Sequence, residues 1–117
     1  MIEADVEGRL VRRVTKLGAK AIKVEAIGLR GFPDRLVLDH GGRLLFVETK
    51  SPTGRLSAQQ KLWIGTLRRF GFQVEVPRTL EEVDALVAAW FAGGKRKRPG
   101  GDIPPETPRG VGEKKRG

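Results

Sequence analysis

The sequence predicts a small α/β domain in which a mixed β-sheet is flanked by helices. Three features predict it: an apolar stripe of helical period near the N-terminus, two Leu- and Val-rich runs joined by His40-Gly41-Gly42-Arg43, and a helix followed by a strand after them. The expected element order is αβββαβα. The hairpin makes the second and third strands antiparallel, whereas a helical crossover makes the fourth strand parallel to the third.

The three predicted helices are defined by apolar stripes and by their caps. The first covers residues 3–17 and ends before Gly18, the second follows Ser57 and ends at Phe70, and the third opens with the capping box at 79–82 and ends at Gly93-Gly94. The side chains expected to face the core are Val6, Leu10, Val14, Leu17, Leu56, Trp63, Ile64, Leu67, Phe70, Val83, Leu86, Val87, Trp90 and Phe91. The two tryptophans are therefore expected to pack rather than to stack on bases.

The four predicted strands cover residues 21–27, 35–39, 44–49 and 72–77. The loop between the first two contains Gly28, Gly31 and Pro33. Glycine allows the backbone to approach a neighbouring element closely, and proline stiffens the start of the following strand. His40, in the hairpin turn, is interpreted as a turn residue.

Charge and composition divide the 117-residue chain into a body and a tail. Residues 1–92 are expected to form one domain, with 15 Lys or Arg against 11 Asp or Glu. Residues 93–117 are expected to be a basic, disordered tail, because they hold eight Lys or Arg against three Asp or Glu and contain few large apolar side chains. The net charge of +9 favours an anionic partner.

Several function classes are disfavoured by what the chain lacks. It has no cysteine, so it can form neither a disulfide nor a thiolate metal site. It has no apolar run of membrane-spanning length, no basic amphipathic helix with aromatic side chains on one face, and no apolar signal region. We therefore expect a cytoplasmic protein whose anionic partner is nucleic acid rather than a membrane.

Two acids and a lysine occupy the ends of the predicted hairpin strands. Folding the hairpin brings Asp34 beside residue 48 or 49, and strand alternation puts Glu48 and Lys50 on one face. Two carboxylates this close repel each other unless a cation lies between them. Mg²⁺ or Mn²⁺ suits such oxygen ligands, and the backbone carbonyl of Thr49 could add a third. The cluster suits metal-dependent phosphodiester cleavage; the alternative is a capping Asp34 and a surface ion pair between Glu48 and Lys50.

Gly31-Phe32-Pro33-Asp34, Glu48-Thr49-Lys50 and Gln60 together resemble the GxPD…ExK…Q signature of the VRR-NUC (virus-type replication-repair nuclease) family. The resemblance extends over about residues 3–85 and implies the restriction-endonuclease-like core of the PD-(D/E)xK superfamily. It implies that Asp34 and Glu48 are metal ligands, that Lys50 is the catalytic lysine, and that Gln60 supports the site. Gln60 could equally close a capping box with Ser57.

The resemblance also implies an acid on the first helix. Glu3 and Glu7 lie one turn apart, within or beside the apolar stripe. Related junction resolvases carry an acid about 11 residues before the glycine that ends this helix, which favours Glu7, with Glu3 as the alternative. Either acid could instead serve only as a favourable charge near a helix N-terminus.

The implied function is a Mg²⁺- or Mn²⁺-dependent endonuclease that acts as a homodimer on branched DNA, most plausibly four-way junctions, in phage or bacterial recombination and repair. A nickase or flap nuclease, and a catalytically silent DNA-binding module, are the alternatives. The predicted phosphate contacts are Arg30 and Arg35 beside the site and Lys95, Arg96, Lys97 and Arg98 in the tail, with Lys61, Arg68 and Arg69 as weaker candidates.

Overall fold

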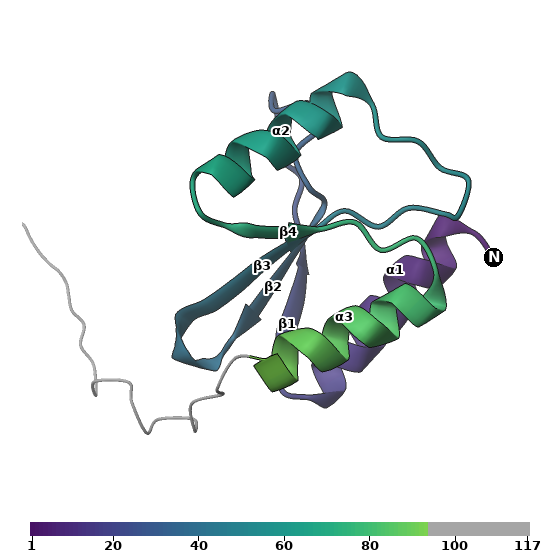
Figure 1. The fold of residues 1–117 in the computed structure, drawn as a ribbon, viewed down its shortest axis with the longest axis vertical. Coiled ribbons are helices and arrows are strands. Elements are labelled where there is room, and N and C mark those ends of the chain that lie inside the picture. The colour runs from purple at the N-terminus through teal and green to yellow at the C-terminus, as the bar shows by residue number, and fades with distance from the viewer. Residues whose placement is uncertain (94–117) are drawn as a thin grey trace, which may run out of the picture.

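The computed structural model describes residues 1–93 and confirms the predicted order of elements (Figure 1). The predicted tail therefore lies, from residue 94 on, outside the described residues. The elements are α1 Glu3–Lys16, β1 Lys20–Lys23, β2 Arg35–Asp39, a 3₁₀ turn His40–Gly42, β3 Arg43–Val47, α2 Ala58–Arg69, β4 Gln73–Glu75 and α3 Leu80–Gly93.

The strands form one mixed sheet in the order β1-β2-β3-β4. The β1–β2 and β2–β3 pairs are antiparallel and the β3–β4 pair is parallel, as predicted. Gly41 and Gly42 in the hairpin turn have φ values of 77° and 75°, a region that glycine enters without strain. The register pairs Arg35 with Val47, so the open end of the hairpin lies one residue beyond this pair.

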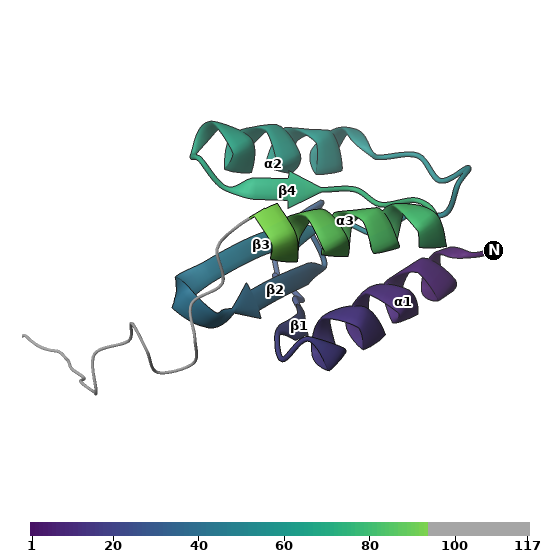
Figure 2. The ribbon, with the colours of Figure 1, turned by 60° about the horizontal axis from the view of Figure 1, so that its bottom comes forward.

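The helices cover the two faces of the sheet unequally. Figures 1 and 2 show α1 and α3 on one side and α2 on the other. The core under α1 and α3 includes Leu45 and Val47 of β3, whereas the core under α2 includes Phe46. Because successive side chains of a strand point to opposite faces, this alternation, continued past Val47, carries Glu48 to the α2 side.

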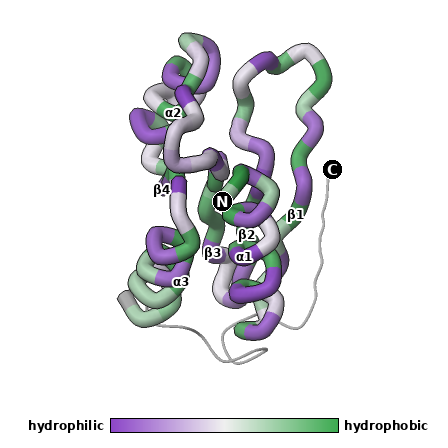
Figure 3. Tube along the Cα trace, turned by 90° about the vertical axis from the view of Figure 1, so that its right-hand side faces the viewer, coloured by the Kyte–Doolittle hydropathy of each residue, from purple (hydrophilic) through white to green (hydrophobic). Residues whose placement is uncertain are grey.

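Burial follows the apolar pattern of the sequence, and Figure 3 shows that pattern as the hydropathy of each residue along the chain. The buried core residues of the helices are Val6, Leu10, Val14, Ile64, Leu67, Val83, Val87 and Trp90. A bidentate pair between Arg9 and Asp84, with N–O distances of 3.0 and 2.8 Å, joins α1 to α3. Within residues 1–93, no helix has the length and apolar character needed to cross a bilayer.

Two predicted core positions are wrong. Leu17 and Phe70 are 39% and 70% exposed, and each is the C-cap residue of its helix, where the chain turns away and the apolar stripe no longer faces the sheet.

The predicted strand at 21–27 is also too long, because β1 ends at Lys23. The chain then forms turns closed by the Leu29 N–H to Ala26 carbonyl bond (3.0 Å) and the Phe32 N–H to Leu29 carbonyl bond (3.1 Å). At the other end of the sheet, β3 ends at Val47, but its pairing continues, since the Glu48 N–H donates to the Glu75 carbonyl at 3.0 Å.

Candidate active site

The open end of the β2–β3 hairpin brings two carboxylates together. One residue beyond the Arg35–Val47 pair, Asp34 lies opposite Glu48, and the Asp34 backbone hydrogen-bonds the Glu48 carboxylate. Glu48 is only 4% exposed. The predicted convergence of Asp34 and Glu48 is therefore present in the structure.

Both carboxyl groups have pKa values above their usual ones. Burial, followed by the negative charge of Asp34, raises the pKa of Glu48 to about 7, although the nearby Lys50 ammonium acts to lower it. Burial also raises the pKa of Asp34, and its Oδ1 atom is buried without a hydrogen-bond partner. A carboxylate pair in this condition is the donor set that a divalent cation prefers.

Gln60 makes hydrogen bonds compatible with both of the roles that its sequence position suggested. Its side-chain carbonyl accepts from the Ser57 N–H at 2.8 Å, while the Ser57 hydroxyl accepts from the Gln60 N–H at 3.1 Å, so the capping box of α2 is complete. Its amide nitrogen donates to Glu48 Oε2 at 3.1 Å. Because the cap fixes which side of the amide faces Ser57, it also aims the amide N–H donor at the Glu48 carboxylate.

The Gly31-Phe32-Pro33 segment holds Asp34 in place by packing on α2. Gly31 has a φ of 88°, and a Cβ atom there would lie 2.5 Å from the Gln59 carbonyl carbon and 2.7 Å from the Gln60 nitrogen. The Phe32 ring meets the Trp63 ring edge-on at 5.0 Å between centroids. The glycine therefore allows the loop to touch the first turn of α2, beside the Gln60 that contacts Glu48.

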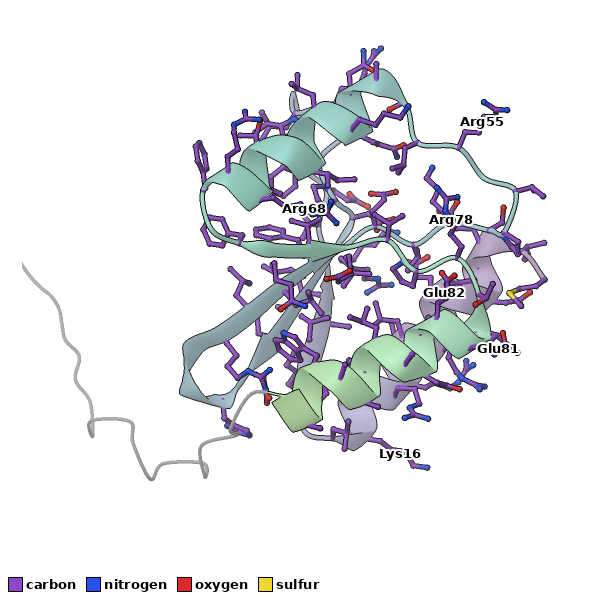
Figure 4. All side chains as sticks on the ribbon, viewed as in Figure 1. Lys16, Arg55, Arg68, Arg78, Glu81 and Glu82 are labelled. Carbon is purple, nitrogen blue, oxygen red and sulfur yellow. The ribbon has the colours of Figure 1, made fainter. Side chains whose placement is uncertain are left out.

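The segment after Lys50 is held by an arginine that sequence reasoning missed. The Lys50 N–H donates to the Pro77 carbonyl at 3.1 Å, and the Arg78 guanidinium donates to the Gly54 carbonyl. Figure 4 shows Arg78 reaching toward the loop before α2. The Arg78 N–H in turn donates to Glu82 Oε1 at 2.8 Å. No local motif marks Arg78, because its partner is a backbone carbonyl 24 residues away.

The two acids of helix α1 differ in how they affect the charges around Asp34 and Glu48. Glu7 Oε2 accepts from Lys23 Nζ at 3.0 Å and from Arg35 Nε at 2.8 Å. Burial would raise the pKa of Glu7, but these two cations outweigh it and lower the pKa. The negative charge of Glu3 contributes to the raised pKa of both Asp34 and Glu48.

The carboxylates do not form a complete metal cage by themselves. Among the residues that the structure describes, no three His, Cys, Asp or Glu side chains are grouped closely enough to hold a metal ion. The Glu7 carboxylate engages Lys23 and Arg35 instead. The side chain of Thr49, the residue between Glu48 and Lys50, is fully buried. Strand alternation turns it away from the face of Glu48, so Thr49 can offer its backbone carbonyl rather than its hydroxyl.

Among the residues predicted to contact phosphate, some side chains are exposed to solvent and others are bonded to groups of the protein. Arg30 is exposed beside the Gly31–Asp34 segment. Arg35 differs from its expected role: its side chain is 17% exposed and its guanidinium bonds Glu7 and the Ala21 carbonyl, because strand alternation turns it toward α1. The Arg68 guanidinium, labelled in Figure 4, donates to the Val74 carbonyl at 2.6 Å. Lys95, Arg96, Lys97 and Arg98 lie outside the described residues.

Comparisons with known proteins point to one family. The model of the VRR-NUC domain matches residues 8–79. "Putative nuclease p44" of Acyrthosiphon pisum secondary endosymbiont phage 1 is 39% identical over 74 residues, which cover 63% of this chain and 80% of that protein. The Fanconi-associated nuclease 1 homolog of Oryza sativa subsp. japonica is 49% identical over 51 residues, which cover 39% of this chain and only 5% of that protein.

Solved structures agree with the sequence comparisons. A VRR_NUC domain with 28% identity superposes with a TM-score of 0.71, covering 76% of this chain and 97% of that one. A second VRR_NUC domain protein, 18% identical, shares the fold with a TM-score of 0.66, covering 83% of this chain and 93% of that one. Since the family model spans more than half of the sequence and the phage relative is matched over most of its length, the chain belongs to the VRR-NUC family of nucleases.

Proposed function

We propose that the protein is a metal-dependent, structure-specific endonuclease that hydrolyses phosphodiester bonds in branched DNA. The observation that carries the proposal is the pair formed by a buried Glu48 and a partly buried Asp34, which face each other beside Lys50, with a pKa of about 7 at Glu48. A pair of desolvated acids with raised pKa values is more typical of a functional site than of a structural ion pair. The net charge of +9 favours a polyanionic substrate.

The donor set fits a hard divalent cation, Mg²⁺ or Mn²⁺. Asp34 and Glu48 would hold it with the backbone carbonyl of Thr49, and the buried Asp34 Oδ1 without a hydrogen-bond partner supports this assignment. When bound, such an ion supplies positive charge to a phosphate oxygen and lowers the pKa of a coordinated water. Glu7, whose carboxylate is held by Lys23 and Arg35, or alternatively Glu3, would add negative charge to the site from α1.

The other residues of the site position and neutralise charge. Lys50 lies close enough to Glu48 to lower the pKa of that carboxyl group, so its ammonium can orient the attacking water or neutralise charge that develops on the phosphate. Gln60 holds the Glu48 carboxylate through its amide N–H. Arg30, exposed just before the Gly31–Asp34 segment in the chain, is proposed to contact a DNA phosphate, and the basic tail to add salt-sensitive affinity.

We extend the proposal to a homodimer that cuts four-way junctions in recombination or repair, in the cytoplasm of a bacterial host and encoded by a phage or the host. Two copies related by twofold symmetry offer two active sites to the two strands that a symmetric junction cut requires. Leu62 and Phe70, 65% and 70% exposed at α2 and its C-cap, are apolar side chains that a second copy would cover.

A substrate panel tests the proposal. The full chain is incubated with linear, flap, fork and four-way DNA, with and without Mg²⁺, beside Glu48→Ala and Lys50→Ala. We expect Mg²⁺-dependent cleavage of the four-way junction that both substitutions abolish while junction binding persists. Preferred cleavage of flaps or single nicks would replace the substrate assignment. Tight junction binding without cleavage at any Mg²⁺ concentration would favour a silent DNA-binding module.

A further inference from the structure

A second lysine, Lys23, lies between two of the acids. Its Nζ is 3.0 Å from Glu7 Oε2 and 3.8 Å from Asp34 Oδ2. Glu7 belongs to α1 and Asp34 precedes β2, so the ammonium links the helix acid to the acid of the hairpin. This is where a cation shared by the two carboxylates would lie.

The sheet fixes the position of Lys23. The β1–β2 register pairs Lys23 with Arg35, and the next residue, Val24, donates its N–H to the Asp34 carbonyl at 2.9 Å. Arg35 is itself held by Glu7 and by the Ala21 carbonyl at 3.1 Å. Lys23 and Arg35 therefore form one anchored unit that faces Glu7.

The two carboxylate oxygens of Asp34 have different surroundings. Asp34 Oδ2 faces the Lys23 ammonium, whereas the buried Oδ1 has no hydrogen-bond partner. Glu48 lies opposite Asp34, and neither of the ion pairs found for Lys23 involves Glu48. An ammonium is a compact point charge with three donors, so it can satisfy a carboxylate pair that a metal ion would otherwise bridge.

We propose that Lys23 is a positioning residue that takes the place of a second divalent cation, so that each active site binds a single metal ion between Asp34 and Glu48. The inference rests on the proposed metal-dependent function. It assigns Glu7 to an internal charge cluster with Lys23 and Arg35, and it leaves Asp34 Oδ1, Glu48 and the Thr49 carbonyl as the ligand set.

Manganese binding tests the inference without reference to activity. Mn²⁺ is titrated into the metal-free full chain and followed by calorimetry and by the electron paramagnetic resonance signal of free Mn²⁺. The variants are Lys23→Met, Lys23→Arg, which keeps the positive charge, and Lys20→Met, which removes an exposed lysine from the same strand. Lys23 is half exposed, so its replacement should leave the fold intact.

We expect one Mn²⁺ per chain for the wild type, Lys23→Arg and Lys20→Met, and a second Mn²⁺ for Lys23→Met, with a larger Mn²⁺-induced rise in Tm. Two ions bound by the wild type would overturn the inference even if no variant folded. One ion bound with unchanged affinity by Lys23→Met would overturn it too and leave the proposed function standing. No Mn²⁺ binding by the wild type would instead remove the metal dependence on which both proposals rest.

Discussion

The two ends of the β2–β3 hairpin carry the same kind of residue under opposite conditions. At the closed end, Asp39, whose side chain is fully buried, faces Arg43 Nη1 at 3.6 Å, and the Arg43 guanidinium lies over the Trp90 ring, 4.0 Å from its centroid. At the open end, Asp34 faces a second acid, Glu48.

This difference distinguishes an acid that is paired within the fold from the acids that we propose to serve the reaction. A buried carboxylate with its own cation is compensated within the fold. A carboxylate opposite another carboxylate raises the pKa of its neighbour, and a bound cation can relieve that cost. The closed end therefore pairs its acid with a cation of the same hairpin, whereas at the open end the proposed metal ion would supply the positive charge.

The largest effect that we expect comes from removing one charge at each end of the hairpin. At the open end the cleavage rate should fall, and at the closed end the free energy of unfolding should fall. Glu48→Gln should slow cleavage by about a thousandfold or more, because it removes a ligand worth several kcal/mol in the transition state. It should not lower the free energy of unfolding at neutral pH. Arg43→Ala should leave the cleavage rate near that of the wild type but lower the free energy of unfolding by roughly 3 kcal/mol, since the buried Asp39 loses the positive charge of Arg43.

Urea unfolding and single-turnover cleavage measure both quantities. Comparable losses of stability in the two variants would contradict the separation.

Two glycine substitutions test how much stability depends on the close contact between the loop before Asp34 and helix α2. Gly31→Ala and Gly28→Ala both introduce a side chain at a positive φ, 88° and 82°, but only at Gly31 does the new Cβ meet other atoms. Gly28→Ala should cost about 1 kcal/mol of stability from backbone strain alone, and Gly31→Ala roughly 2–4 kcal/mol. Thermal unfolding compares them, and equal losses would show that the loop does not depend on close contact with Gln59 and Gln60.

Gln60 variants separate the cap from the active site. Gln60→Ala should cost about 1 kcal/mol by removing half of the capping box and should also slow cleavage about 10–100-fold. Gln60→Glu keeps an acceptor for the Ser57 N–H, so it should fold nearly as stably, yet it places a carboxylate beside Glu48 and should slow cleavage at least as much.

Gln59→Ala is the control for both variants, because Gln59 is exposed on the same turn. Normal cleavage by Gln60→Glu would mean that the amide donor plays no part in the site.

The pH dependence of stability is the smallest expected effect. Burial raises the pKa of Glu48 from its ordinary value of 4.5 to about 7, so the metal-free folded protein holds this proton more tightly than the unfolded chain does. The resulting stabilisation is full below about pH 4.5 and is lost as the pH rises through 7; Asp34, whose pKa is also raised, acts in the same direction. Glu7 acts oppositely, but its lowered pKa puts its effect at more acidic pH.

Between about pH 5 and 7, the wild type should therefore lose about 1–2 kcal/mol more than Glu48→Gln, measured by urea unfolding in the presence of a chelator. Parallel pH profiles for the two proteins would show that Glu48 titrates normally. Added Mg²⁺ should flatten the wild-type profile.

The element order, the two sheet faces and the meeting of Asp34 with Glu48 could all be predicted from the amino-acid sequence, because each depends on local patterns. Strand alternation, a tight Gly-Gly turn and capping residues operate over a few positions, and a short hairpin turn sets its own register. Leu17 and Phe70 were misplaced at helix ends, where the pattern continues for one residue after the backbone has turned away.

The partners of the charged side chains depended on contacts between distant segments. Arg35 bonds Glu7, 28 residues away, and Arg78 bonds the Gly54 carbonyl, 24 residues away. Lys23 reaches Glu7 and Asp34, which are 16 and 11 residues away. A long, flexible cation can reach several acids, and the packing of α1 and β1 against β2 selects among them. The acids of the candidate site can thus be recognised in the sequence, whereas their neutralisation is a property of the folded chain.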